Sequence, residues 1–161
     1  MNPFRIREAK LPDDKPALLE FILGSQHFEH QFEPDRRLDA PVAEEHFTRL
    51  SADVSRRNGR IFVAEGAKGE LFGWSVAHER ENEIFVVPEE RLIGYIAELY
   101  VIEEGRGKGI GRALIEACEN WGRSRGLKAM MIGVLSGNAR ARRIYEASGF
   151  APYAIELRKY L

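Results

Sequence analysis

The sequence predicts a single α/β domain, in which one mixed, twisted sheet carries helices on both faces. Its 161 residues fit one domain. Two apolar runs flank the turn-forming sequence "EGAKGE" over residues 60–79, which predicts an antiparallel hairpin. Strand–helix–strand patterning over residues 93–135 predicts parallel neighbours instead. One sheet must therefore contain both kinds of strand pair.

The first half of the chain predicts two helices before the hairpin. Residues 4–10 alternate like a short strand, and residues 12–23 form the first predicted helix. We expect an irregular, aromatic-bearing connection over residues 24–41 and a second helix over residues 42–59. Residues 80–92, after the hairpin, fit part strand and part loop.

The second half alternates strands and helices. A strong strand is predicted over residues 93–102, and an amphipathic helix over residues 110–126. Residues 127–135 predict a strand, residues 138–149 a helix, and residues 150–160 a closing strand pair or bent strand. The expected order is β-α-α-β-β-β-α-β-α-β.

Composition excludes several broad classes. Lys plus Arg total 24 and Asp plus Glu total 25, so no broad basic face for nucleic acid is expected. The single cysteine, Cys118, can form no internal disulfide, which fits a reducing compartment. No apolar run approaches the roughly 20 residues of a membrane helix, and the first ten residues are too mixed for a signal peptide. We therefore expect a cytoplasmic protein without a nucleic-acid or membrane partner.

The stretch "EEGRGKGIGR", residues 103–112, carries the clearest chemical signal. Three glycines in five residues follow a predicted strand and open a predicted helix. The first amides of a helix have no internal acceptor and lie at the positive end of its dipole. Glycines also let a ligand approach the backbone, because no Cβ intrudes. This pattern predicts an anion site, although an exposed basic turn remains an alternative.

Two common nucleotide templates fail at this loop. The dinucleotide pattern requires a glycine where the chain has Arg112. The P-loop pattern requires a glycine where the chain has Ile102, and Ser or Thr where it has Gly109. A nucleotide-phosphate protein is therefore disfavoured.

The remaining pattern, Arg106-x-x-Gly109-x-Gly111, resembles the acyl-coenzyme A loop of the GNAT acetyltransferase superfamily. That loop reads [Arg/Gln]-x-x-Gly-x-[Gly/Ala], and residues 97–115 resemble its surroundings throughout. "NARARRIYEASGF", residues 138–150, resembles the second cofactor-contacting segment of the family. The resemblance implies a GNAT fold and acetyl-coenzyme A as cosubstrate, with its pyrophosphate on the backbone of residues 106–111. No metal is implied.

The resemblance also implies individual cofactor contacts. Pantetheine would lie where strand 95–102 splays from strand 129–135, and the Val101 amide would polarise the thioester carbonyl. Lys108 and Arg112 would give electrostatic support, and Asn138, a natural N-cap, would also bond the pantetheine arm. The implied cofactor-binding residues are Leu99, Tyr100, Val101, Arg106, Gly107, Lys108, Gly109, Ile110, Gly111, Arg112, Asn138, Arg140 and Arg143.

Glu98 is an unusual residue for its position. It lies in "YIAELYVI", which is otherwise apolar, and glutamate is depleted in strands and seldom buried without a partner. A carboxylate here predicts a polar cavity, where it could take a proton from the amine acceptor or bind the ammonium. The alternative is a structural ion pair with an arginine.

Tyr145 falls on one stripe of its predicted helix with Ala141, Ile144 and Ser148, which by itself predicts a core tyrosine. By resemblance, Tyr145 is the general acid that protonates the departing coenzyme A thiolate. A phenol of pKa about 10 suits that task.

The acceptor side is predicted from position and composition alone. Residues 25–37 lie where the family has its variable acceptor-binding segment. The residues expected to form an amine pocket are His27, Phe28, Glu29, Trp74 and Glu83. His27-x-x-His30 is the only compact histidine spacing, and no cysteine lies nearby, so metal is not expected. Cys118 is expected to pack in the core.

Together these features predict an N-acetyltransferase in which a primary amine attacks acetyl-coenzyme A directly in a ternary complex. The acceptor is a small-molecule or peptide amine that the sequence leaves unspecified. A non-catalytic acyl-coenzyme A binding or sensing module on the same fold remains the alternative. A homodimer is possible.

Overall fold

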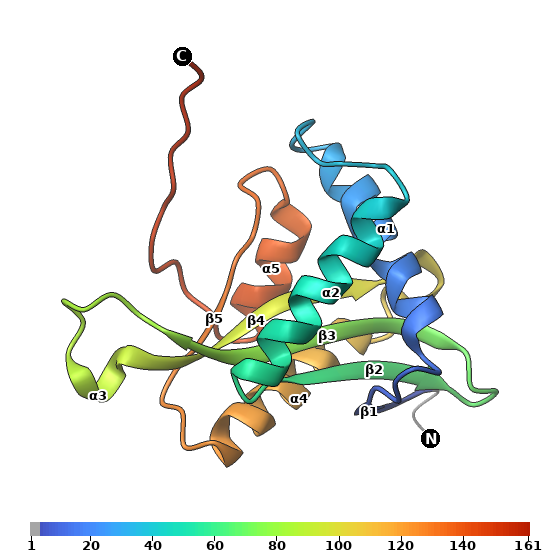
Figure 1. Cartoon of the computed structure of the whole chain (residues 1–161), viewed down its shortest axis with the longest axis horizontal. Coiled ribbons are helices and arrows are strands. Elements are labelled where there is room, and N and C mark those ends of the chain that lie inside the picture. Colours follow the sequence, from blue (N-terminus) through green and yellow to red (C-terminus); the bar gives the residue numbers. More distant parts are fainter. Residues whose placement is uncertain (1–3) are drawn as a thin grey trace.

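The computed structural model describes residues 4–161, which form one five-stranded sheet (Figure 1). The strand order follows the sequence, β1-β2-β3-β4-β5. The first four strands pair antiparallel, and β5 pairs parallel to β4, so the predicted mixed sheet is confirmed. The strands are β1 (Phe4–Glu8), β2 (Arg60–Gly66), β3 (Leu71–Glu81), β4 (Leu92–Val101) and β5 (Met130–Ile132).

Helices cover both faces of this sheet (Figure 1). Val63, Trp74 and Val76 belong to the core cluster under α1 and α2, whereas Ala64 belongs to a second cluster with Leu114 of α4. Successive residues of β2 thus pack in the cores on opposite faces of the sheet, because side chains alternate between the two faces along a strand. The helices are α1 (Lys15–His30), α2 (Pro41–Arg56), α3 (Pro88–Arg91), α4 (Ile110–Ser124) and α5 (Ala139–Ala147), with a 3₁₀ turn at Glu103–Gly105. No helix in the described part of the chain combines the length and apolar character that crossing a bilayer requires.

Helix α1 is longer than predicted. It continues to His30, so residues 24–30 are helical and not part of an irregular connection. The predicted connection begins at Gly24, but this residue lies within the helix and packs closely against Tyr100. A Cβ on Gly24 would lie 2.5 Å from the hydroxyl oxygen of Tyr100, so any larger residue here would displace the Tyr100 side chain.

The predicted closing strand is wrong. Residues 150–161 form no helix or strand, and the segment runs away from the sheet (Figure 1). The preceding strand is also short, because β5 spans only Met130–Ile132 of the predicted residues 127–135. A period-two pattern becomes a strand only when another strand supplies its hydrogen bonds, and residues 150–161 have no such neighbour in the described chain.

Two irregularities of β4 position the site. It pairs with β5 only over Gly94–Ile96, so residues 97–101 have no partner on that side. On its other side, the register with β3 shifts between Val76 and Ala77, which face Glu98 and Ile96 and leave Ala97 as an extra residue. Such a bulge twists the strand and re-aims the side chains next to it. β4 and β5 thus separate after Ile96, just before Glu98.

Candidate active site

The glycine loop presents a run of unpaired backbone donors. The Arg106 amide donates to the carbonyl oxygen of Glu103 at 3.0 Å, so it is not available to a ligand as predicted. The amides of residues 107–112 have no acceptor among residues 4–161. Gly107 and Gly109 adopt φ of 76° and 81°, the left-handed region that favours glycine, and a Cβ on either would meet open space. This geometry suits an anion at the start of α4.

Strand β4 presents a further donor at Val101. The amide of Ile102 donates to the carbonyl oxygen of Phe72, on the β3 side. Peptide groups alternate along a strand, so the Val101 amide faces the opposite side, where β4 and β5 have separated. The Nε of Arg106 donates to the Val101 carbonyl oxygen at 3.1 Å, so it holds the next peptide group, which joins Val101 to Ile102.

A cavity of about 520 Å³ joins the loop to the gap between the strands. Lys108 does not line it, and its ammonium lies 5.5 Å from the ring centre of Phe72. All the other predicted cofactor residues line this cavity: Leu99, Tyr100, Val101, Arg106, Gly107, Gly109, Ile110, Gly111, Arg112, Asn138, Arg140 and Arg143.

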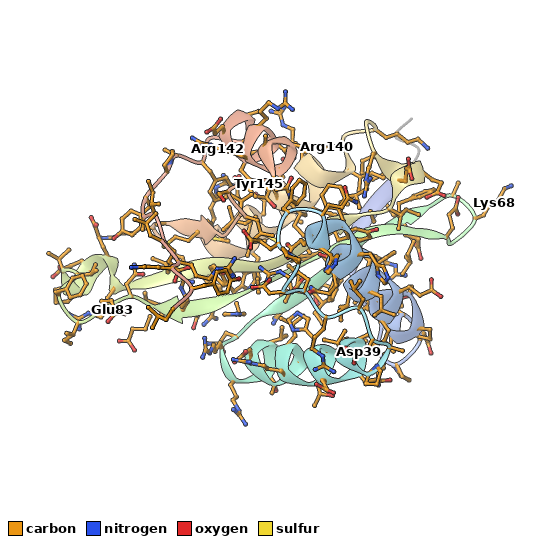
Figure 2. All side chains as sticks on the ribbon, turned by 90° about the horizontal axis from the view of Figure 1, so that it is seen from above. Asp39, Lys68, Glu83, Arg140, Arg142 and Tyr145 are labelled. Carbon is orange, nitrogen blue, oxygen red and sulfur yellow. The ribbon has the colours of Figure 1, made fainter. Side chains whose placement is uncertain are left out.

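Helix α5 forms a wall of this cavity and contributes nothing to the core. None of its residues is buried, so the predicted core stripe is wrong. Ala141, Ile144 and Tyr145 line the cavity instead. The Asn138 side chain caps the helix by accepting from the Ala141 amide at 3.1 Å, as its residue type predicts. Figure 2 shows Tyr145 on the side of α5 toward the sheet.

A second cavity, of about 380 Å³, lies between α1, α2 and β4. Glu98 lines this cavity, together with His46, Glu29 and Arg36. Five residues line both cavities, and Tyr145 is one of them; the others are Ser25, Glu29, Leu99 and Gly133. The two spaces therefore meet at Tyr145, between the glycine loop on one side and Glu98 on the other.

His46, which the sequence did not single out, is the partner of Glu98. Its Nε2 lies 2.5 Å from Oε1 of Glu98, and the two side chains are 35% and 14% exposed. The hydrogen bond with Glu98 raises the pKa of His46, against the opposing effect of burial. The alternative that the sequence left open, an ion pair of Glu98 with an arginine, is thus not what forms: the partner is a histidine. His46 lies beside Phe47 and Ala43 on the buried side of α2. This position on the helix was the only feature of the sequence that could have indicated His46 as a site residue.

Tyr145 is half-buried at the junction, and its ring packs edge-on against Phe150 at 6.3 Å. Burial, followed by the negative charges of Glu29 and Glu98, raises the pKa of Tyr145 to about 12. The phenol therefore stays protonated at neutral pH and can donate a proton.

The expected acceptor residues divide into two groups. Phe28 and Glu29 line the cavities, and Glu29 accepts from Arg36 at 3.0 Å. His27 is exposed and hydrogen-bonds the Leu23 carbonyl oxygen without lining either cavity.

Two expected acceptor residues lie away from the site. Trp74 is fully buried in the core, because its strand turns this position toward α1 and α2. Glu83 lies at the end of the β3–β4 hairpin, far from Tyr145 in Figure 2. The predicted roles of Trp74 and Glu83 in an amine pocket are therefore wrong.

The described residues contain no cluster of three potential metal ligands. The Cys118 thiol is fully buried and donates to the Ser75 hydroxyl at 3.3 Å. Burial raises its pKa to about 12, so a thiolate nucleophile does not form near neutral pH.

Residues 24–150 match the acetyltransferase (GNAT) family. The match covers most of the chain and includes both the glycine loop and α5. The chain belongs to this family and is an acyltransferase.

Relatives within the family act on different acceptors. The chain is 26% identical over 110 residues to an aminoglycoside N(6')-acetyltransferase type 1 of Stenotrophomonas maltophilia, covering 68% of the chain and 71% of the relative. It is 38% identical to a mycothiol acetyltransferase of Thermobispora bispora, covering 60% of the chain but 32% of that relative. It is 36% identical to a streptothricin acetyltransferase of Streptomyces lavendulae, covering 62% and 49%. The chain thus spans less than half the length of the mycothiol and streptothricin acetyltransferases.

Solved structures share the fold. A mutant protein from Bacillus halodurans superposes with a TM-score of 0.80 at 22% identity, covering 98% of this chain and 99% of that one. A putative acetyl transferase from Pyrococcus furiosus gives 0.73 at 23% identity, with the same coverage.

Proposed function

We propose that this protein is an N-acetyltransferase that carries an acetyl group from acetyl-coenzyme A to a primary amine by direct attack in a ternary complex. One observation carries the proposal. The cavity lined by the unpaired amides and the cavity lined by Glu98 meet at Tyr145. A donor entering along one cavity and an acceptor entering along the other would have their reacting ends at the same place.

The residues of the larger cavity fit acetyl-coenzyme A, which supplies the activated thioester when bound. The amides of residues 107–112 would hold the pyrophosphate, since unpaired donors at a helix start bind anions. Arg112, Arg140 and Arg143 line the same cavity and would add positive charge. The Val101 amide would stabilise negative charge that develops on the thioester carbonyl oxygen.

The smaller cavity fits an amine. The reaction forms an N–C bond, breaks a C–S bond, and moves one proton from the nitrogen to the thiol, while an ammonium acceptor loses one further proton. We assign Glu98, hydrogen-bonded to His46, to bind the ammonium or to receive a proton from it. Glu98 and His46 would act together, because an incoming ammonium would meet a carboxylate that is already hydrogen-bonded to an imidazole.

Tyr145 is assigned to give its proton to the departing thiolate. Its raised pKa keeps the hydroxyl protonated near neutral pH, so the proton would be available to the thiolate. Its place at the junction of the cavities puts this proton beside both substrates.

The test is acetyl-coenzyme A-dependent release of free thiol across a panel of amines. The panel should include aminoglycosides, streptothricin and methionine sulfone, since relatives act on these compounds, together with polyamines and peptides. Thiol release with a matching acetylated amine supports the proposal. Tight coenzyme A binding without turnover across the panel would favour a binding or sensing module.

A further inference from the structure

The smaller cavity leaves at most one negative charge for an acceptor. Its lining carries two carboxylates, Glu29 and Glu98. The Nε of Arg36 donates to Glu29 at 3.0 Å, and Nε2 of His46 lies 2.5 Å from Glu98. A neutral His46 leaves one charge uncompensated, and a protonated His46 leaves none. A second ammonium on the acceptor would therefore lie near a cation without a carboxylate of its own, which is unfavourable away from bulk water.

Arg36 is not free to hold an anionic group of the acceptor. Its guanidinium also donates to Asp35 at 2.8 Å, so it lies between two carboxylates. Asp35 does not line the cavity and pairs with Arg158 as well, at 2.6 Å. A carboxylate or phosphate that approached Arg36 would be repelled by Glu29 and Asp35. The cavity thus disfavours an acidic group as well as a second ammonium.

Three neutral polar side chains of the cavity lining have no hydrogen-bond partner within residues 4–161. They are the hydroxyl of Ser25 and the amide of Gln26 on α1, and the hydroxyl of Tyr95 on β4. Ser25 is only 9% exposed, and a polar group this buried is normally hydrogen-bonded. Uncharged donors and acceptors that converge on one cavity match hydroxyl groups on a ligand.

The hydroxyl of Tyr95 lies near the place where the two cavities meet. A Cβ on Gly133 would lie 3.5 Å from this hydroxyl, and Gly133 lines both cavities. The Tyr95 ring is held from outside the cavity, because the guanidinium carbon of Arg80 lies 4.0 Å from its centre. A hydroxyl held there would meet a polar group on the carbon next to the acceptor amine.

We propose that the acceptor is a small monoamine whose other polar groups are neutral hydroxyls, the chemical class of a 2-amino-2-deoxyhexose. This inference rests on the proposed function, because it names the acceptor of the same site. The ammonium meets the carboxylate of Glu98, and the hydroxyls meet Ser25, Gln26 and Tyr95. The volume of about 380 Å³ lies near the low end for small-molecule pockets, about 300–1,000 Å³, which suits a single ring.

Acetyl transfer to this acceptor forms an N–C bond and breaks the C–S bond of the thioester. The ammonium loses two protons, of which one passes to the thiolate and the other, through Glu98, to solvent. The product is a neutral amide, so it no longer carries the charge that bound the acceptor to the carboxylate.

The first test measures kcat/KM for thiol release with glucosamine and with cyclohexylamine, which has a ring of the same size without hydroxyls. The two amines differ in basicity, so the ratio of their kcat/KM values is compared between variants. Ser25→Ala, Gln26→Leu and Tyr95→Phe should each lower the glucosamine-to-cyclohexylamine ratio about three- to tenfold, the effect of one lost hydrogen bond. Gln31→Leu is the control, since Gln31 is exposed and lines neither cavity. A ratio that none of the three variants lowers overturns the inference.

The second test concerns the charge balance of the cavity. Arg36→Gln removes the cation that compensates Glu29, so it should raise kcat/KM for 1,4-diaminobutane relative to glucosamine by about fivefold. Arg37→Gln is the control, because Arg37 pairs with Asp39 and Glu45 and does not line the cavity. A ratio that stays constant in Arg36→Gln overturns the charge argument and the monoamine class with it.

Failure of this inference is distinct from failure of the proposed function. Acetylation of other amines but not of glucosamine would overturn the acceptor class and leave the acetyltransferase function intact. Binding of coenzyme A without acetylation of any amine would overturn both.

Discussion

Nε2 of His46 lies 2.5 Å from Oε1 of Glu98 and joins α2 to β4 across the smaller cavity. The bulge at Ala97 precedes this contact, so the carboxylate points toward α2 at the place where β4 leaves β5. The positive charge of Arg49 lowers the pKa of His46, but by less than the hydrogen bond with Glu98 raises it. This pair connects the helical layer to the proposed chemistry.

The first prediction concerns the titration of His46. Glu98→Gln should lower the pKa of His46, because the hydrogen bond with the carboxylate is the largest cause of its raised value. An NMR titration of the imidazole measures this directly. His27 lines neither cavity and bonds only a backbone oxygen, so its NMR signals control for a general disturbance of the fold. An unchanged His46 pKa would mean that the pair does not persist in solution.

The same pair predicts a pH-dependent stability. A group whose folded-state pKa is raised stabilises the fold fully below its unfolded pKa, which for His46 is 6.5. This contribution is lost as the pH rises through the folded-state pKa. The loss in the free energy of unfolding caused by Glu98→Gln should therefore be larger at pH 6 than at pH 9. Urea unfolding at both pH values measures it, and an equal loss at both would argue against a charged imidazole.

Tyr145→Phe should lower kcat about 100-fold, the usual scale for loss of a general acid. The KM for acetyl-coenzyme A should change little, because the ring keeps its contact with Phe150. Since the pKa of Tyr145 is raised to about 12, deprotonation of the phenol should not reduce the wild-type kcat up to about pH 10. Tyr153→Phe, at an exposed position, is the control. An unchanged kcat would assign Tyr145 to packing alone.

Local sequence signals predicted the parts of the fold that local physics determines. The hairpin, the strand before the glycine loop and the amphipathic helix after it all form as expected. The end of α1 was wrong because Gly24 reads as a helix stop, whereas its contact with Tyr100 is tertiary. The strand predicted over residues 150–160 was wrong because an alternating pattern does not say which strand will pair with it.

The site residues also divide into those that local sequence signals indicate and those that only tertiary packing brings together. The loop amides and Tyr145 each lie within a contiguous motif, so the sequence could indicate them. His46 and Arg36 lie far along the chain from Glu98, and only the packing of α2 and of the connection before it brings them to one cavity. Trp74 was misassigned because strand residues of the same polarity can face either layer, and this one faces the core.

Gly109→Glu should weaken coenzyme A binding at least tenfold. The new carboxylate would stand beside the unpaired amides and repel a pyrophosphate, and the left-handed backbone adds a cost of about 1 kcal/mol in stability. Gly69→Glu is a matched control, because Gly69 has φ of 87° and equally open surroundings. It adjoins Lys68, which Figure 2 shows far from Tyr145. Calorimetric titration with coenzyme A should separate the two variants, and similar affinities would mean that the loop does not hold the anion.

Arg106→Lys tests whether Arg106 acts by position or by charge alone. The Nε of Arg106 donates to the Val101 carbonyl, while its guanidinium lies 5.1 Å from the ring centre of Phe28. Lysine keeps the charge but lacks the planar group that makes both contacts. The Val101 peptide should then be held less firmly, and kcat should fall about tenfold, a fraction of the loss seen when an oxyanion donor is removed. Coenzyme A affinity should stay nearly constant.

Steady-state kinetics and calorimetry on Arg106→Lys and on Lys108→Ala distinguish these roles. Lys108 does not line the cavity, so its removal should leave kcat unchanged and affect binding only slightly. A normal kcat for Arg106→Lys would show that the Val101 peptide is held by its strand alone. A fall in affinity with kcat intact would instead show that the planar guanidinium contributes to binding, since lysine keeps the charge, and the proposed polarisation by the Val101 amide would then need no support from the loop.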